Sequence, residues 1–498
     1  MNMTTRYIYV LAFFSGMCIM AVELCASRLM APFFGTSTFV WTNIIGIIMI
    51  ALSAGYVVGG RLADRKPRLD VLLRLLLSAC GYLLVLPFVA SPVVRWLSSL
   101  MVGLNSSFSF IFFGSLAAIT LLFSLPIVVM GMTSPFLVRI IAQSGHEGDS
   151  AGRIFGISTI GSVVGTFLPV LVFIPTVGTG KTILFFSAVL FVVTAVGFSR
   201  KGAALLSVAA AVPLLLPVPS MRETPGTVYR TESAYQYIEV FDRGPFRYLV
   251  YNDAVGFQTV ANKQSVLTGI NYYYDYYSLL PFLFGDPPQN ALIIGLGGGI
   301  IANQLHYFHP RLEIDGVEID PKVIEIARSY FALSDAVRTY NQDGRIFVDL
   351  LGDGKHAIVI IDAYTQQVYI PFHLTTREFF SQVKRGLTDD GIVAMNVSSA
   401  REDSPLIQSI SNTLRLVFGH VYRLRIPGSV DNVVLASDRS VDFTLLAGAG
   451  GTELRGIARY SQENFRESEF DTRYRPLTDD LAPIEHMVDW EILKRGIR

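Results

Sequence analysis

The sequence of 498 residues contains only three cysteines, Cys18, Cys25 and Cys80, all within its first hundred residues. The rest of the chain therefore has no thiols from which to build a disulfide framework or a cysteine-rich zinc site. Its histidines show no spacing typical of a metal site, so no bound metal is expected. Charged residues make up only 16%, whereas 51% of the residues are hydrophobic. So apolar a chain is not one soluble domain, and its length allows at least two domains.

The zero net charge conceals an uneven distribution along the chain. Residues 1–220 carry 13 Lys and Arg against 5 Asp and Glu, which leaves 27 against 35 for residues 221–498. Because phosphate binding needs a basic surface, the acidic second half argues against nucleic acid as a partner. We therefore predict a membrane domain over residues 1–220 and a soluble catalytic domain over residues 221–498.

Long apolar runs dominate the first domain, and runs of about 17 to 25 such residues can cross a bilayer as helices. Six runs are clear, and a seventh is doubtful because it is short and contains three prolines. They span residues 7–30, 39–60, 69–90, 108–141, 154–177, 181–198 and, doubtfully, 203–219. No small-residue cleavage site follows the first run, which predicts a retained helix rather than a signal peptide. We expect a polytopic α-helical domain with the lipid bilayer as its partner.

Short strands and helices alternate in the second half. Residues 235–242 and 247–252 alternate in hydrophobicity like the strands of a hairpin, and 272–284 resembles a helix. Further apolar strands are expected at 291–295, 312–319, 357–361 and 391–397, with helices such as 321–330 and 376–386 between them. This order predicts an α/β Rossmann-like domain with a parallel sheet, preceded by a small β-hairpin region. Its ligand should bind at the carboxyl ends of the strands.

Glycines and acids follow the ends of these strands. Four glycines follow the first strand, namely Gly295, Gly297, Gly298 and Gly299. Because glycine has no side chain, a nucleotide can approach the backbone there. Glu318 ends the next strand, where a carboxylate can accept both ribose hydroxyls. Asp343 and Gly344 lie on the following loop and suit an adenine amino group. Together these features predict an adenosine ligand, and the lack of clean GxGxxG spacing disfavours a dinucleotide.

The segment before the parallel sheet resembles spermidine synthases, and above all the membrane-fused members of that family. TESAYQYIEV is similar to their Glu-Ser-x-Tyr-Gln opening, in which the Gln contacts the nucleoside; here Gln236 follows Tyr235. LVYNDAVGFQT is similar to their Asp-Gly-x-x-Gln hairpin, with Asp253 and Gln258 as the nearest matches. The resemblance extends over residues 227–397, about a third of the chain.

Two further motifs carry the same resemblance. NYYYDYY is similar to the family's Tyr-His-Glu helix, with Tyr273, Tyr274 and Asp275 in those places. IVIIDAYTQ is similar to the strand that ends in the catalytic acidic loop, and it places Asp362 and Tyr364 on that loop. The likeness implies a class I methyltransferase or spermidine synthase type of fold.

Three positions depart from the family pattern. Gly298 stands where the family's glycine loop has the Asp that holds the aminopropyl ammonium, and Thr365 replaces the second Asp of the acidic loop. Tyr274 replaces a histidine. The two missing carboxylates weaken the predicted grip on a diamine and leave room for a substrate that keeps its own carboxylate. S-adenosylmethionine is therefore an alternative to its decarboxylated form.

The resemblance implies an enzyme that uses S-adenosylmethionine or its decarboxylated form as a substrate, with no permanently bound cofactor. It would cleave the bond between sulfur and the three-carbon chain and release methylthioadenosine. The predicted catalytic residues are Asp362, Tyr235, Tyr364, Tyr274 and Asp275. The predicted nucleoside-binding residues are Gln236, Gln258, Gly295, Gly297, Gly299, Glu318, Asp343 and Gly344.

Three other functions remain as alternatives. An acceptor-independent lyase or cyclising enzyme would also release methylthioadenosine, and a methyltransferase would use the same fold and substrate. A transporter with a nucleoside-sensing domain is the third, because residues 55–68 are similar to a loop of major facilitator transporters. A homo-oligomer is left open. Basic loops and the cytoplasmic origin of the substrate predict a catalytic domain on the cytoplasmic side of a bacterial-type inner membrane.

Overall fold

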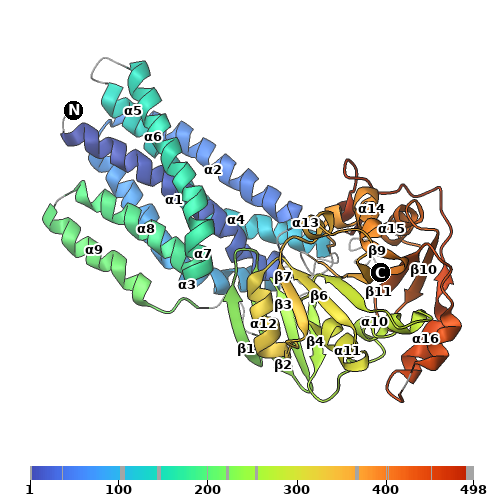
Figure 1. Ribbon diagram of the computed structural model, residues 1–498. Helices are drawn as coiled ribbons and strands as arrows, with labels where there is room; N and C mark the ends of the chain where they lie inside the picture. The colour runs from blue at the N-terminus through green and yellow to red at the C-terminus, as the bar shows by residue number, and fades with distance from the viewer. Residues whose placement is uncertain are drawn as a thin grey trace. The chain divides into compact units, whose positions relative to one another are not determined.

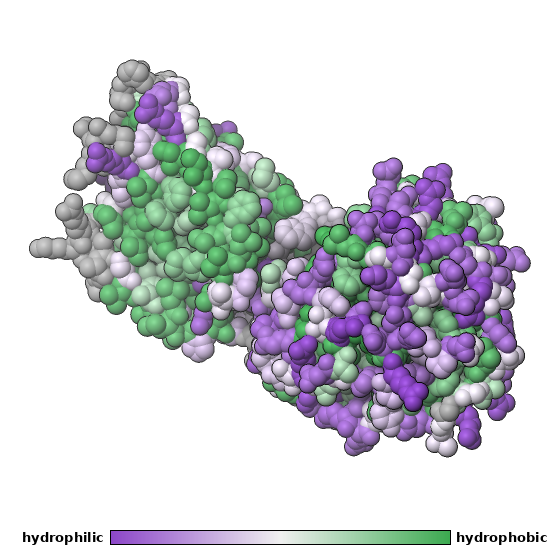
Figure 2. All heavy atoms as spheres, in the orientation of Figure 1, coloured by the Kyte–Doolittle hydropathy of each residue, from purple (hydrophilic) through white to green (hydrophobic). Residues whose placement is uncertain are grey.

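The computed structural model describes residues 3–35, 37–100, 107–142, 147–198, 200–219, 224–252, 256–364, 369–399, 401, 403–449 and 451–488. The chain divides into two compact units (Figure 1). The first unit comprises Met1–Glu223 with Thr231–Tyr237, and the second comprises Thr224–Arg230 with Ile238–Arg498. Figure 2 shows a mostly hydrophobic surface on the first unit and a mostly hydrophilic one on the second.

Helices build the first unit. They are α1 (Met3–Phe34), α2 (Thr38–Arg65), α3 (Leu69–Leu100), α4 (Ser107–Gly131), α5 (Thr133–Ala142), α6 (Glu147–Leu168), a π-helical turn (Pro169–Phe173), α7 (Ile174–Val177), α8 (Thr179–Val196) and α9 (Arg200–Leu215). Within the described residues, six helical spans are long and apolar enough to cross a membrane. These match the six clear runs of the sequence. The seventh, α9, has only 16 residues and contains Pro213.

A four-stranded sheet precedes the larger one, in the order β1 (Thr227–Glu232), β2 (Tyr237–Arg243), β3 (Phe246–Tyr251) and β4 (Thr259–Asn262). The predicted hairpin is confirmed, because β2 and β3 pair antiparallel. However, β2 starts at Tyr237 and not at Tyr235. The hydroxyl of Ser233 accepts hydrogen bonds from the amides of Tyr235 and Gln236, and these local bonds form a turn in place of a strand.

The second unit is built on an eight-stranded sheet with the order β12-β10-β11-β9-β8-β5-β6-β7. Its strands are β5 (Asn290–Ile294), β6 (Glu313–Glu318), β7 (Val337–Asn341), β8 (His356–Ile361), β9 (Leu387–Ser398), β10 (His420–Arg425), β11 (Asp431–Ser437) and β12 (Arg466–Glu467). Strands β7, β6, β5, β8 and β9 run parallel, and β11 is antiparallel to β9 and β10. The expected Rossmann-like fold, of the class I methyltransferase and spermidine synthase type, is therefore confirmed.

Helices cover both faces of this sheet. Residues of α10 (Tyr274–Tyr277), α11 (Ile300–Phe308), α12 (Pro321–Phe331) and α16 (Arg455–Asn464) share one apolar core with one face. Residues of α13 (Gly344–Asp349), α14 (Arg377–Gly386) and α15 (Pro405–Arg415) share a second core with the other face. The prediction of one helix over 272–284 is wrong: α10 ends at Tyr277, and a separate 3-10 turn covers Leu280–Leu283. Pro281 has no amide hydrogen with which to continue α10.

The binding edge of the sheet lies where the strand order reverses. The chain passes from β5 to β6 and β7 on one side, and then to β8 and β9 on the other. Ligands of such sheets bind at the carboxyl ends of the strands next to this switch point. Here the backbones approach closely, because a Cβ on Gly295 would lie 2.4 Å from the carbonyl oxygen of Asp362. Gly295 also has a φ of +88°, so only glycine suits this position.

Candidate active site

Glu318 ends β6 and faces the glycine turn after β5. Its Oε2 accepts hydrogen bonds from the amides of Leu296 and Gly297, both at 3.2 Å, and its Oε1 accepts one from the amide of Asp320 at 3.1 Å. Burial raises the pKa of this carboxyl. The amide bonds fix the carboxylate at the strand end where the ribose of a bound nucleoside lies in this fold.

Asp343 begins the helix after β7. Its Oδ1 accepts hydrogen bonds from the amides of Arg345 and Ile346, which makes it the N-cap of α13, and Gly344 is the first residue of that helix. Its Oδ2 lies 3.6 Å from Nε2 of His373. The capping bonds hold Asp343 at the same edge of the sheet as Glu318, as the sequence predicts for an adenine contact.

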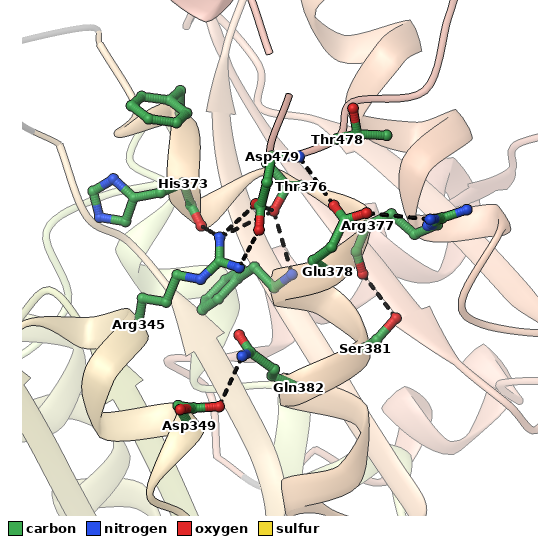
Figure 3. A network of polar contacts seen from close by, with 12 residues as sticks. Arg345, Asp349, His373, Thr376, Arg377, Glu378, Ser381, Gln382, Thr478 and Asp479 are labelled. Atoms are coloured by element: carbon green, nitrogen blue, oxygen red, sulfur yellow. Dashed lines mark hydrogen bonds and ion pairs between the residues drawn. The ribbon is translucent and has the colours of Figure 1, made fainter. Parts of the chain in front are cut away.

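Arg345, two residues after Asp343, contacts Asp479 in the segment after β12, as Figure 3 shows. Its guanidinium donates to both carboxylate oxygens of Asp479, at 2.7 and 2.6 Å, and to the carbonyl of His373 at 2.9 Å. The hydroxyl of Thr376, the N-cap of α14, donates to Asp479 at 2.7 Å. This segment, the tail, therefore braces the loop that carries His373.

The glycine turn is packed against β4. The amide of Gly298 donates to the hydroxyl of Thr259 at 2.8 Å, and a Cβ on Gly298 would lie 2.6 Å from Cγ2 of Thr259. Gly297 and Gly299 are in the same turn, and Gly299 directly precedes α11. No side chain can stand at residue 298 unless Thr259 moves. Gly298 is therefore required by packing, and an aspartate side chain does not fit at residue 298.

Asp362 follows β8 directly and is the half-buried acid of the site. The hydroxyl of Tyr273 lies 3.0 Å from Oδ1 and 2.9 Å from Oδ2 of this carboxylate. Burial and the nearby charge of Asp431 raise the pKa of Asp362 to about 7, against the lowering effect of hydrogen bonds from Tyr273 and Asn396. A carboxylate with a pKa near neutrality is suited to accept a proton.

The second half of the chain is similar to known proteins. The spermine/spermidine synthase domain matches residues 273–432. A probable polyamine aminopropyl transferase of Bifidobacterium longum is 30% identical over 285 residues, which cover 52% of this chain and 63% of that protein, or just under two thirds of its length. The polyamine aminopropyltransferase of Vibrio vulnificus is 32% identical over 271 residues, which cover 51% of this chain and 89% of that protein.

The chain belongs to the spermine/spermidine synthase family. Among solved structures, a probable spermidine synthase from Corynebacterium glutamicum aligns with 53% of this chain and 99% of its own, at 16% identity and a TM-score of 0.43. Members of this family are transferases of polyamine biosynthesis, and the matching family domain lies in the second unit.

Tyr273 contacts Asp362 but is absent from the catalytic residues that the sequence predicts, which include Tyr274 and Asp275. Its match to the Tyr of the family's Tyr-His-Glu motif is the signal in the sequence that points to it. Tyr274 packs against it with ring centroids 4.3 Å apart, and its hydroxyl reaches the carbonyl of Gln258 at 3.5 Å. Asp275 points elsewhere: it accepts hydrogen bonds from the amides of Thr268 and Gly269 and from Gln304. These bonds give Asp275 a loop-holding function, and its catalytic role stays a prediction.

Tyr364, which lies two residues after Asp362, is hydrogen-bonded to β9. Its hydroxyl donates to the carbonyl of Asn396 at 2.9 Å and accepts from the amide of Ser398 at 3.2 Å. Gln258 has a buried side-chain nitrogen that finds no acceptor among the described residues. Such an orphaned donor fits a polar atom of a bound nucleoside substrate. Tyr235 is exposed and Gln236 is buried on the turn before β2, and their part in the site stays a prediction.

Two further residues of the family motifs, Asp253 and Thr365, lie outside the described residues.

Proposed function

We propose that the second unit transfers a three-carbon amine chain from decarboxylated S-adenosylmethionine to an amine acceptor and releases methylthioadenosine. The observation that carries this proposal is the pair of Asp362 and Tyr273 at the switch point of a family-type sheet. The nitrogen lone pair of the acceptor attacks the carbon next to the sulfonium, and the carbon–sulfur bond breaks with its electrons moving to sulfur. The proton lost by the acceptor passes to Asp362.

The nucleoside part of the donor is matched by the residues around the glycine turn. Glu318 and Asp343 offer carboxylates at the ends of β6 and β7, at the places where ribose and adenine bind in this fold. Gln258 offers an unpaired amide donor. These residues support the binding of an adenosine group.

The geometry of the site says less about the three-carbon group on the sulfur of the donor. Thr259 occupies the space next to Gly298, so the family's loop aspartate has no counterpart here. A donor that keeps its own carboxylate meets no opposing charge at this position. This observation makes S-adenosylmethionine the second candidate donor, and both donors belong in the test.

We further infer that the enzyme is membrane-bound through its six apolar helices and that the catalytic unit faces the cytoplasm. The helices are long and apolar enough to cross a bilayer, and sulfonium nucleosides are made in the cytoplasm. Proteolysis of sealed inside-out and right-side-out vesicles tests this topology. Cleavage of the catalytic unit only in inside-out vesicles is expected, and cleavage only in right-side-out vesicles would contradict it.

The test of the reaction is product identification by mass spectrometry with the full chain in detergent. Each donor is incubated with and without 1,4-diaminobutane. Methylthioadenosine together with an aminopropylated amine supports the transfer. Methylthioadenosine without any acceptor requirement supports the lyase or cyclising alternative, and S-adenosylhomocysteine supports a methyltransferase. If neither donor is consumed, the proposal fails.

A further inference from the structure

A cavity of about 350 Å³ lies beside α11, outside the candidate active site. It is bounded by β4 with the loop that follows it, by α11, and by the end of α12. Figure 1 shows β4 and α11 side by side in the second unit. None of the predicted catalytic or nucleoside-binding residues is among the described residues that line this cavity. The cavity is therefore available to a second ligand.

One face of α11 forms a wall of the cavity. Ile300, Gln304 and Tyr307 all line it, and their spacing of four and three residues places them on the same side of the helix. Gln304 is 1% exposed, whereas Tyr307 is 56% exposed. Gln304 therefore lies at the floor of the cavity and Tyr307 lies at its rim.

The side-chain amide of Gln304 is paired at one end only. Its Nε2 donates to the carbonyl of Val266 at 3.0 Å and to Oδ1 of Asp275 at 2.7 Å. These two acceptors fix which end of the amide is the nitrogen. The other end, Oε1, is buried and has no donor among the described residues. A buried acceptor without a donor costs free energy, so a ligand that brings an N–H group is favoured there.

The rest of the lining indicates an uncharged ligand. No Lys, Arg, Asp or Glu is among the described residues around the cavity. A charged ligand would lose its hydration without gaining a counter-charge. The Oδ1 of Asn262 accepts from the amide of Gln264 at 3.0 Å, which leaves its Nδ2 as a donor for a ligand. Val266 and Phe331 add apolar surface, and the volume suits a compound of one or two rings.

We propose that this cavity binds a small uncharged ring compound with a carboxamide-like edge, in which an N–H group stands beside a carbonyl oxygen. The N–H group donates to Oε1 of Gln304, and the carbonyl oxygen accepts from Nδ2 of Asn262. The ring packs against Val266 and Phe331. This site is separate from the proposed transfer reaction and does not depend on it.

Gln304 connects the cavity to the loop before α10. Asp275, which accepts from Gln304, also accepts from the amides of Thr268 at 2.9 Å and Gly269 at 2.7 Å. A donor on Oε1 polarises the Gln304 amide and strengthens the bond from its Nε2 to Asp275. Ligand binding should therefore stabilise this loop, and the ligand would act as an effector rather than as a substrate.

The test uses benzamide and acetophenone, which have almost the same shape, although only benzamide has N–H groups. Each is titrated into the full chain in detergent, and hydrogen exchange around residues 266–269 is followed by mass spectrometry. Benzamide should slow this exchange. Acetophenone should need at least about tenfold higher concentrations, because it leaves Oε1 of Gln304 without a donor. Neither measurement requires turnover, so failure of the proposed reaction does not affect the result.

Val266→Phe fills the cavity and should abolish the response to benzamide. Val228→Phe is the matched control, because Val228 is a similarly exposed valine on β1 that does not line the cavity. It should keep the response, and unchanged exchange elsewhere in the second unit reports that each variant is folded. No response of the wild type to benzamide, an equal response to both compounds, or a response that persists in Val266→Phe would overturn the assignment.

Discussion

The hydroxyl of Tyr273 lies within 3.0 Å of both carboxylate oxygens of Asp362, at the carboxyl end of β8. A donated hydrogen bond stabilises the ionised carboxylate, whereas burial and the charge of Asp431 oppose ionisation. The balance raises the pKa of Asp362 to about 7, where the group can accept a proton at neutral pH. The relationship between these two residues therefore sets the pH range of the proposed reaction.

Removal of the Tyr273 hydroxyl should shift that range. In Tyr273→Phe, the pKa of Asp362 rises further, so the rising limb of kcat/KM should move upward by about one pH unit. Activity at pH 7 should fall about fivefold, because the ionised fraction of Asp362 falls by that factor, and it should recover at higher pH. Tyr276→Phe is the control, since Tyr276 lies in α10, which starts directly after Tyr273, and its hydroxyl donates to the carbonyl of Ile270. An equal loss at every pH would show that Tyr273 acts only by packing.

The wild-type pH profile gives a second prediction. Because Asp362 must be ionised to accept a proton, kcat/KM should rise as the pH increases through about 7. Asp362→Asn should lack this limb and lose about a hundredfold or more in kcat. A profile that is flat from pH 5 to 8 in the wild type would contradict a base at this position.

Stability should change with pH in the opposite direction. The pKa of Asp362 is raised from 3.8 to about 7, so the folded state is favoured when this group is protonated. Its contribution is fully present below pH 3.8 and is lost as the pH rises through about 7. Comparison of thermal unfolding of the wild type and Asp362→Asn between pH 5 and 8 isolates this effect. The difference in stability should shift toward the variant as the pH rises from 5 to about 7 and level off above that pH.

Glu318 should govern affinity for the nucleoside rather than for the acceptor. Glu318→Gln keeps the size of the side chain but removes the charge, and methylthioadenosine should bind at least about tenfold more weakly. Glu313→Gln, at the start of the same strand, is the control because Glu313 forms an exposed ion pair with Arg338. Calorimetric titration of both variants makes the comparison. Unchanged affinity in Glu318→Gln would remove Glu318 from the binding site.

The contact between Arg345 and Asp479 should hold the tail in place. Asp479→Asn weakens a bidentate ion pair that is partly exposed, so exchange of the amides around residues 477–481 should accelerate by about tenfold or less. Hydrogen exchange with mass spectrometry measures this directly. Asp471→Asn, which changes an ion pair between close neighbours in the same tail, provides the comparison. Equal exchange rates in the wild type and both variants would show that the ion pair between Arg345 and Asp479 does not stabilise the tail.

The position of the expected nucleoside-binding residues at one edge of the sheet could be predicted because its signals are local. Glu318 ends β6, and the glycines and Asp343 follow β5 and β7 within a few residues, so a strand–turn–helix pattern was enough to place them there. The predicted strand at 357–361 likewise placed Asp362. In contrast, Asn396 and Asp431 meet only because β11 inserts next to β9, and strand order is not visible in the local pattern.

Local features of the chain explain why two predicted elements have other bounds in the structure. The turn at Ser233 delays the start of β2, and Pro281 separates α10 from the 3-10 turn after it. Asp275 matches a family motif in the sequence. The sequence does not show that its carboxylate accepts hydrogen bonds from the amides of Thr268 and Gly269. These partners of Asp275 are only six and seven residues away, but the contacts depend on how the loop before α10 turns, and the hydrophobic pattern does not show that turn.

The most direct test of the central claim is the coupling between methylthioadenosine release and amine consumption by the full chain. Purified protein is given decarboxylated S-adenosylmethionine and 1,4-diaminobutane, and both products are quantified over time in the wild type and Asp362→Asn. Our account predicts one aminopropylated amine for each methylthioadenosine, negligible release without amine, and loss of both products in the variant. Release that continues at the same rate without amine, or formation of S-adenosylhomocysteine, would contradict it.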